Sequence, residues 1–292
     1  MYQAISSNQA KSIFVMLLFM AVLVGLGYVF GEVTHFRELV VVAFVFALIS
    51  VLASYYYSDR IVLAMSRARP AERSEYLELY NAVEGLSIAA GLPTPRIYVI
   101  DDTAPNAFAT GRDPQHAVIA VTTGLTQKLN RQELEGVVGH EMAHIKDYDI
   151  RFMTIVAVLV GTIALVSDWM LRIFWWGGGD GDRRRGGGAA LALVGLLLAI
   201  AAPLIAVLMQ MALSRTREYL ADAEGAMLTR YPDGLADALE KLDADTEPLE
   251  VANKATAHLY IVNPLKEHGG VLNNLFSTHP PIEERVRRLR AM

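Results

Sequence analysis

Two long apolar runs open the chain, at residues 13–30 and 39–57, and neither contains a charged side chain. Each approaches the ~20 residues that an α-helix needs to cross the hydrocarbon core of a bilayer. The second run ends in Tyr55, Tyr56 and Tyr57, which is typical of the aromatic belt at a membrane surface. The pair predicts an uncleaved transmembrane hairpin. A cleaved signal peptide is the alternative, but its apolar core is usually shorter than this first run.

Two further apolar runs, at about residues 152–176 and 189–213, predict a second hairpin. Asp168 and Arg172 interrupt the run at 152–176, whereas the run at 189–213 is long and apolar. Both are nearly apolar all round, as helices that face lipid are. The alternative is that they are buried helices of a soluble domain. Whether this second hairpin fully crosses the membrane stays open.

Basic residues near the ends of the first two runs predict how the chain is oriented. Arg37 lies between these runs, beside Glu32 and Glu38, whereas four arginines follow the second run, at positions 60, 67, 69 and 73. Because cytoplasmic loops carry the excess of Lys and Arg, we expect the segment after residue 57 to be cytoplasmic. The second hairpin supports this poorly, because its tip carries three arginines at 183–185, which oppose translocation.

Composition agrees with a membrane anchor joined to one soluble domain. Of the 292 residues, 53% are hydrophobic and 20% are charged, and the mean hydropathy of +0.31 is high for a soluble protein. A net charge of −5 argues against a nucleic-acid-binding protein, which usually has a basic face. The chain contains no cysteine, so disulfides and thiolate zinc sites are excluded, and metal ligands must be His, Asp or Glu.

The expected organisation is an anchor hairpin (1–57), a first catalytic part (58–151), a second hydrophobic hairpin (152–213) and a second catalytic part (214–292). Apolar periodicity and turn residues predict helices at 72–90, 126–129, 131–147, 215–229 and 235–242, and a last helix that opens at Pro280 and Pro281. Strands are expected at 96–100, 107–110 and 117–122. The fold class is therefore α+β, mostly helical with a small β-sheet, plus transmembrane helical hairpins.

His140, Glu141 and His144 form an H-E-x-x-H motif inside one of these predicted helices. Positions i and i+4 share a helix face, so both imidazoles can bind one Zn²⁺ ion. Glu141 then lies beside the metal and can act as the general base that activates water. Gly136 and Gly139 precede the motif and would let another element pack closely against this helix.

Three further stretches, together with this motif, make nearly the whole chain resemble the M48 family of zinc metallopeptidases. They are Asn106-Ala107-Phe108-Ala109, Ser214-Arg215-Thr216-Arg217-Glu218-Tyr219-Leu220-Ala221-Asp222 and Thr278-His279-Pro280-Pro281-Ile282-Glu283-Glu284-Arg285. The layout of two hydrophobic hairpins around H-E-x-x-H also matches, and the closest similarity is to the bacterial HtpX-type membrane proteases. The resemblance implies a zincin-like catalytic domain.

The resemblance also implies that Glu218 is the third zinc ligand, which would give a His₂Glu site with one open position. Asp222 follows four residues later on the same helix face and could accept the free N–H of a ligand histidine. Without the resemblance, an exposed Glu and Asp flanked by Arg215 and Arg217 would be an equally good interpretation. Arg285 could hold a ligand carboxylate, although a structural ion pair is the simpler expectation.

Two other segments have roles that come only from the resemblance. Asn106, Ala107, Phe108 and Ala109 resemble the segment that lines the substrate cleft, where an edge strand can pair with a peptide backbone. The alternative is an ordinary edge strand. His279 resembles a histidine near the metal that donates a hydrogen bond to the tetrahedral oxyanion. The alternative is that Thr278 and His279 cap the helix after the two prolines.

The expected function is that of a membrane-anchored zinc endopeptidase with one Zn²⁺ per subunit. The resemblance implies damaged or misfolded membrane proteins as substrates, cut at the cytosolic face of the bacterial inner membrane, with roles in protein quality control and the stress response. The expected partners are unfolded or membrane proteins, the lipid bilayer and quality-control proteins, and no nucleic acid. Two alternatives are a non-catalytic, zinc-stabilised membrane scaffold and a protease that matures prenylated peptides.

Overall fold

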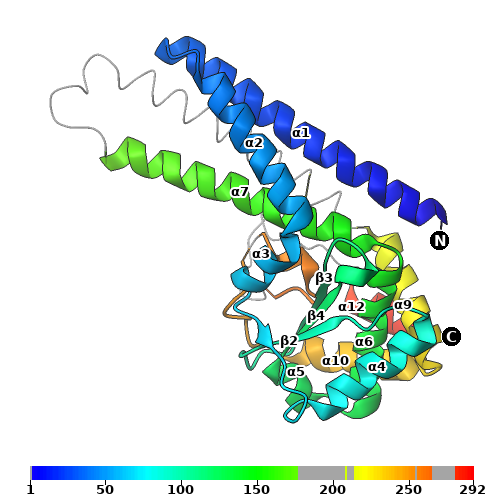
Figure 1. Ribbon diagram of the computed structural model, residues 1–292. Helices are drawn as coiled ribbons and strands as arrows, with labels where there is room; N and C mark the ends of the chain where they lie inside the picture. The colour runs from blue at the N-terminus through cyan, green and yellow to red at the C-terminus, as the bar shows by residue number, and fades with distance from the viewer. Residues whose placement is uncertain (1, 177–207, 209–213, 254, 265–279) are drawn as a thin grey trace.

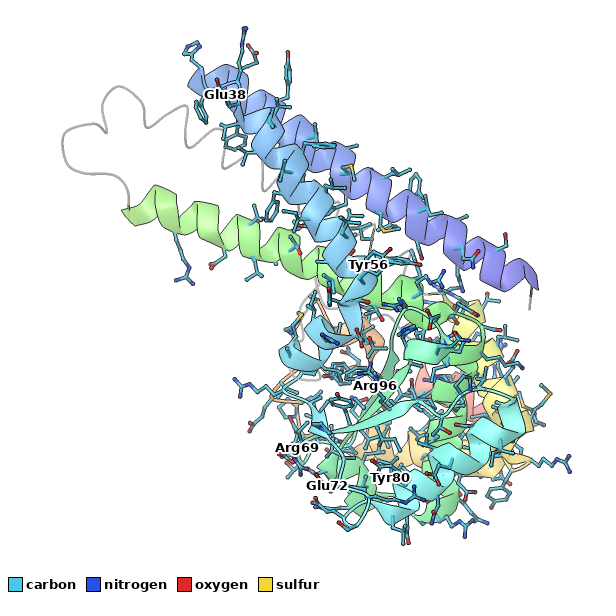
Figure 2. The ribbon with its side chains drawn as sticks, in the orientation of Figure 1. Glu38, Tyr56, Arg69, Glu72, Tyr80 and Arg96 are labelled. Carbon is cyan, nitrogen blue, oxygen red and sulfur yellow. The ribbon has the colours of Figure 1, made fainter. Side chains whose placement is uncertain are left out.

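The computed structural model describes residues 2–176, 208, 214–253, 255–264 and 280–292 (Figure 1). A rounded domain, built of helices and one sheet, carries three long helices that extend from one side of it. Helices α1 (Tyr2–Thr34) and α2 (Leu39–Tyr56) form an antiparallel hairpin. The hairpin turns near Glu38, far from the domain, and returns to it at Tyr56 (Figure 2). The first predicted hairpin is therefore present in the structure.

The two hairpin helices expose most of their apolar surface. Ile13, Leu17, Val41 and Ile49 are each more than half exposed, as expected of side chains that face lipid. The helices approach closely where Gly27 meets Ala43, because a Cβ atom at position 27 would lie 2.4 Å from the Ala43 Cβ. Residues 6–32 and 39–56 each have the length and hydropathy of a membrane span.

The third apolar run forms one long helix, α7 (Asp149–Trp176), whose residues 149–168 are also long and apolar enough to span a membrane. In contrast to α1 and α2, 72% of its most hydrophobic window is buried inside the protein. Met153 and Ala157 pack beneath the sheet, and Phe152 and Val156 pack with Val15 of α1. The first half of α7 is thus a core helix, in agreement with the alternative that this run is a buried helix of the soluble domain. Leu165, farther along α7, is exposed. The fourth apolar run lies outside the described residues, apart from the buried Leu208.

A four-stranded sheet with the order β1-β2-β4-β3 forms the centre of the domain. Strands β2 (Arg96–Ile100) and β4 (Val118–Thr122) are parallel, whereas β1 (Arg69–Pro70) and β3 (Ala107–Thr110) pair antiparallel at the two edges. The three predicted strands are confirmed, with β4 starting one residue later than expected. Strand β1 is not predicted because it has two residues and one of them is proline, which is tolerated at a sheet edge.

Both faces of this sheet are buried, and the alternation of side chains divides them. Ala107, Ala109, Ile119 and Val121 share a core with the helices that carry the H-E-x-x-H motif and its neighbours. Phe108, Val118 and Ala120 lie in a second core with Val62 of α3 (Ser58–Met65) and with α7. The sheet therefore lies between the motif helix and a helix of the membrane anchor.

The remaining helices are α4 (Leu77–Ala90), α5 (Thr123–Lys128), α6 (Arg131–Lys146), α9 (Arg215–Thr229), α10 (Pro232–Ala244) and α12 (Ile282–Leu289), with 3₁₀ turns at Pro114–His116 and Ala257–Leu259. The prediction for α4 was five residues too long at its start, because Tyr76 has a non-helical backbone conformation. Helix α5 begins three residues earlier than predicted, because the Thr122 hydroxyl caps it. The mostly helical α+β class with a small sheet is confirmed.

Helices α6 and α9 are in contact along their backbones, and glycines allow this. A Cβ atom on Gly225 of α9 would lie 2.8 Å from the backbone nitrogen of His140 and 3.0 Å from the carbonyl carbon of Gly139. On α6, a Cβ atom on Gly136 would lie 2.6 Å from the backbone nitrogen of Leu235 in α10. The expectation that Gly136 and Gly139 permit close packing is therefore confirmed.

Gly225→Ala is expected to destabilise the domain, because the added methyl group has no space between two backbones. Overpacking of this kind costs about 1–3 kcal/mol, against a gain in helix propensity of about 1 kcal/mol. Gly85→Ala on α4 is the matched control, since a Cβ atom there meets nothing within 4 Å. Thermal unfolding in detergent should show a lower melting temperature for Gly225→Ala and an equal or higher one for Gly85→Ala. Equal melting temperatures for both variants would contradict close α6–α9 packing.

Candidate active site

Helix α6 is fixed at its start by a capping box. Asn130 Oδ1 accepts a hydrogen bond from the Glu133 backbone N–H at 3.0 Å, and Glu133 Oε2 accepts one from the Asn130 N–H at 2.8 Å. Lys241 of α10 donates to the same Glu133 oxygen at 2.8 Å. These bonds satisfy donors that a helix start otherwise leaves open. They fix the part of the chain that carries His140, Glu141 and His144, all of which are buried.

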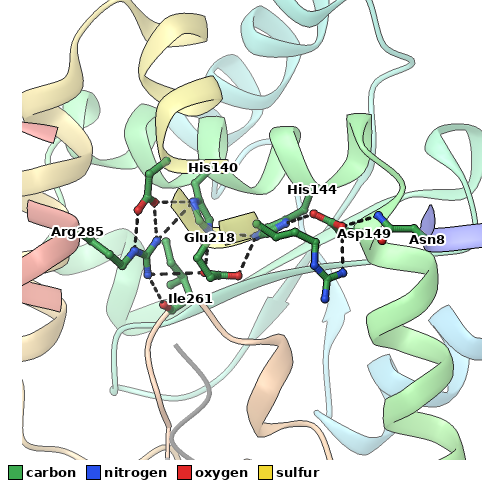
Figure 3. Close-up of polar contacts among 9 residues, drawn as sticks. Asn8, His140, His144, Asp149, Glu218, Ile261 and Arg285 are labelled. Atoms are coloured by element: carbon green, nitrogen blue, oxygen red, sulfur yellow. Dashed lines mark hydrogen bonds and ion pairs between the residues drawn. The ribbon is translucent and has the colours of Figure 1, made fainter. Parts of the chain in front are cut away.

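Three predicted ligand side chains converge between α6 and the first turn of α9 (Figure 3). His140 Nε2 lies 3.2 Å from His144 Nε2, and the Glu218 carboxylate oxygens lie 3.7 Å and 3.6 Å from these two nitrogens. Donor atoms around a tetrahedral Zn²⁺ with bonds of about 2.0–2.1 Å lie about 3.3 Å apart. The spacing of this trio therefore suits a zinc ion.

The hydrogen bonds of the two histidines support the same conclusion. His140 Nδ1 lies 3.0 Å from Asp222 Oδ1, and His144 Nδ1 lies 3.1 Å from Asp149 Oδ2. Ionised carboxylates only accept hydrogen bonds, so both Nδ1 atoms carry a hydrogen, and in the neutral imidazoles both Nε2 atoms present lone pairs. Two lone pairs that face each other at 3.2 Å repel unless a cation, either a proton or a metal ion, lies between them. The donor set fits a metal ion for this reason as well as by its spacing.

The electrostatics of the site also favour a cation. Burial alone would lower the pKa of His144, yet the carboxylates of Asp149, Glu218 and Glu141 raise it to about 9. The same negative potential would attract a divalent ion, which binds a neutral imidazole and displaces the proton.

Arg285 of α12 is fully buried and lies beside the candidate metal ligands. Its guanidinium donates two hydrogen bonds to Asp222, from Nε at 2.8 Å and from Nη2 at 2.6 Å, and Nη1 donates to the Ile261 carbonyl at 3.1 Å. Nη1 also lies 3.9 Å from a Glu218 oxygen. Burial would raise the pKa of Asp222, but the charge of Arg285 and these bonds hold it well below its usual range. Arg285 therefore keeps Asp222 ionised and also lies beside the carboxylate of Glu218.

Sequence reasoning missed Asp149, the acceptor for His144, and its neighbours. The chain reverses after α6 at Tyr148, whose φ is 60°, and this turn brings Asp149 back beside His144. Asp149 Oδ1 accepts from Asn8 Nδ2 of α1 at 2.7 Å and from Arg217 Nη1 of α9 at 3.1 Å. Asn8 is only 3% exposed and also donates to the Asp147 carbonyl. The start of the membrane hairpin thus contacts the carboxylate that pairs with His144, a candidate metal ligand.

Glu141 occupies the position expected of a general base, buried next to the ligands but outside the ligand trio. Burial raises the pKa of Glu141, and the nearby Glu218 carboxylate acts in the same direction. A backbone hydrogen bond from Ala109 of strand β3 opposes this rise. Glu141 therefore lies between the metal ligands and the edge of the sheet.

The predicted substrate segment, Asn106 to Ala109, leads into the edge strand β3, which begins at Ala107, and is entirely buried. Phe108 packs edge-on against Tyr260 at 5.1 Å, on the face away from α6. The Ala107 carbonyl already accepts the Ile261 N–H at 3.0 Å, and the Asn106 amide donates to the Val262 carbonyl at 2.9 Å. The outer edge of β3 is therefore covered near its start, while Ala109 lies beside Glu141. His279 lies outside the described residues.

Comparison with known proteins gives a consistent result. The model of peptidase family M48 matches residues 73–292. A protein named "Protease HtpX homolog" from Dictyoglomus turgidum is 49% identical to this chain, and the match covers 100% of this chain and 94% of that protein. A protein of the same name from Thermoanaerobacter pseudethanolicus is 45% identical, and the match covers 100% of this chain and 98% of that protein. The crystal structure of S. mikatae Ste24p is similar with a TM-score of 0.50 at 21% identity, covering 99% of this chain and 66% of that one. This last similarity concerns the fold alone.

The matched region contains the metal-ligand trio and its supporting carboxylates, and the relatives match the chain along its whole length, including the membrane helices. The resemblance seen in the sequence is therefore confirmed. The protein is a membrane zinc metalloprotease and belongs to peptidase family M48.

Proposed function

We propose that this protease is an endopeptidase that cuts damaged or misfolded membrane proteins at the cytosolic face of the bacterial inner membrane. The observation that carries the proposal is the arrangement of three buried ligands, His140, His144 and Glu218, with Glu141 beside them and not among them. Three protein ligands leave one coordination position for water or substrate, which is typical of catalytic zinc sites. Each of these residue roles is part of the proposal.

In this proposal, His140, His144 and Glu218 hold the ion, and Asp222 and Asp149 fix the two imidazoles through their Nδ1–H groups. Zinc, when bound, supplies Lewis acidity that acidifies water and polarises the scissile carbonyl. Glu141 takes the proton from the attacking water and delivers it to the leaving amine. His279 is proposed to donate a hydrogen bond to the tetrahedral oxyanion.

Substrate binding is proposed to use the backbone of β3. In this antiparallel pair, the Thr122 N–H bonds the Asn106 carbonyl, so alternate residues, including Ala107 and Ala109, direct their backbone groups away from β4. Since Ile261 covers Ala107 and the Ala109 N–H donates to Glu141, the Ala109 carbonyl is the backbone group best placed to accept from a substrate strand next to Glu141. Backbone pairing gives affinity without strong sequence preference, which suits a protease of unfolded chains. Asn106 then acts indirectly, by holding the segment at Val262.

The hairpin supports the proposed cytosolic orientation of the domain. The start of α1 at Asn8 and the end of α2 at Tyr56 both lie on the side of the domain. The arginines that follow α2 favour the cytoplasm for that side.

A closed structural zinc site, as in a scaffold protein, is less well supported. A structural site needs four protein ligands. Among the described residues, the carboxylates next to the trio are already committed: Asp222 binds His140 Nδ1 and Arg285, and Asp149 binds His144 Nδ1. The similarity to Ste24p concerns the fold and supports no particular substrate.

The membrane anchor is proposed to contribute to the site through Asn8. The Asn8 amide and Arg217 both donate to Asp149 Oδ1, whereas His144 Nδ1 bonds the other oxygen, Oδ2. In the proposal, Asn8 and Arg217 thus fix the carboxylate that orients the imidazole. Residues that support the hydrogen-bond partners of metal ligands affect the affinity for the metal as well as the ligand geometry.

Glu141→Gln should abolish proteolysis but keep the metal. Loss of a general base costs about 10²–10⁴-fold in rate, whereas the ligand trio is untouched. The measurement is cleavage of casein by zinc-loaded protein in detergent, with zinc counted in the same samples. Glu135→Gln, which changes a half-buried residue of the same helix that pairs with Arg131, is the matched control and should cut normally. A Glu141→Gln protein that holds one zinc and still cuts at the parent rate would refute this role.

Asn8→Leu should weaken zinc binding by up to about ten-fold, because Asp149 loses one of its hydrogen bonds. Zinc affinity is measured by chelator competition in the Glu141→Gln background, which also prevents self-cleavage. Gln9→Leu tests the hydrophobic change alone, since Gln9 is exposed on the same helix. Equal affinities for Asn8→Leu and the parent protein would show that the anchor does not support the site.

A further inference from the structure

A polar cavity of about 420 Å³ lies where α2 meets the catalytic domain, away from the metal ligands. It is lined by Tyr55, Tyr56, Tyr57, Ser58, Asp59, Arg60, Arg96, Arg112, Gln115 and His116. Three arginines and one histidine thus face a single carboxylate in the lining. The proposed protease mechanism uses none of these residues.

The arginines of the cavity differ in how far they are neutralised. Arg96 pairs with Asp59, and Arg112 lies 3.5 Å from Asp113, just outside the cavity lining. Arg60 lies over the Tyr57 ring at 5.8 Å and forms no ion pair with any residue that the structure describes. By contrast, Arg69 and Arg73, which follow in the sequence, pair with Asp101 and Glu84. The cavity therefore retains a positive charge and several hydroxyl and amide groups.

Tyr56 and Tyr57 are each more than half exposed at the end of an apolar helix, as is typical of the membrane–water boundary. In Figure 2, Tyr56 marks the junction of α2 with the domain, and Arg96 lies on the adjacent part of the domain. Above this junction, α2 exposes Ile49 and Leu52. In a bilayer that α1 and α2 span, the cavity would therefore lie at headgroup depth, next to the exposed apolar side chains of α2.

We propose that this cavity binds the phosphate of an anionic phospholipid, whose acyl chains lie along the exposed face of α2. Arginine and tyrosine donors suit a phosphate group, and a net positive cavity favours a lipid with net negative charge over a zwitterionic one. Soluble phosphate offers the same headgroup chemistry, but it lacks the chains that the apolar face of α2 would bind. The bound lipid would hold the catalytic domain against the membrane at a fixed height.

The test uses full-length Glu141→Gln protein in detergent and native mass spectrometry with dioleoyl phosphatidylglycerol or dioleoyl phosphatidylcholine. We expect phosphatidylglycerol to be retained preferentially. Arg60→Gln should weaken its binding about five-fold, and Arg60→Gln/Arg112→Gln about 25-fold. The matched control is Arg73→Gln/Arg131→Gln, which removes the same charge outside the cavity: Arg73 lies over the ring of Tyr80, which Figure 2 shows at the end of the domain away from Tyr56, and Arg131 pairs with Glu135. Melting temperature and zinc content verify that each variant is folded.

Two outcomes would overturn the proposal. Equal loss of phosphatidylglycerol in the cavity variants and in the control would mean that only overall charge matters. Displacement of the lipid by millimolar inorganic phosphate would assign the cavity to a soluble anion instead. The proposal stands if the lipid resists phosphate and is lost only from the cavity variants.

Discussion

The active site depends on two hydrogen bonds, each between the Nδ1–H of a buried histidine and its own carboxylate. Asp222 holds His140 and Asp149 holds His144, so that both Nε2 lone pairs point at the same space as Glu218. Without these bonds, either imidazole could flip or take the other tautomer, and the ligand trio would not be preorganised. The cost of burying these charged groups is offset because each is paired.

These carboxylates come from distant parts of the chain, and this explains much of the architecture. Asp222 lies on α9 and is fixed by Arg285 of α12, whereas Asp149 opens α7 and is fixed by Asn8 of α1 and Arg217 of α9. Helix α7 also covers one face of the sheet before it extends away from the domain. The membrane anchor is therefore a structural part of the catalytic domain and contributes to its core.

The sequence allowed the local features to be predicted. Spacing of i and i+4 on a helix determines that His140 and His144 share a face, and the strands at 96–100 and 107–110 follow from β-formers between turn residues. Glu218 and Asp222 required the family resemblance, because a Glu 74 residues after His144 has no local link to it. Asn8 and Asp149 gave no such signal. They are single polar residues next to apolar runs, and their contact spans 141 positions. Apolar periodicity also could not show that the first half of α7 is buried by protein, since lipid and a protein core favour the same side chains.

Zinc K-edge X-ray absorption tests the central claim most directly. The sample is zinc-loaded Glu141→Gln protein, compared with the same protein carrying His144→Ala. The account predicts one zinc per chain, coordinated by two imidazoles and by oxygen donors, with one imidazole lost in the His144→Ala protein. A spectrum with three or more imidazoles, or one that His144→Ala leaves unchanged, would place the metal elsewhere and contradict the account.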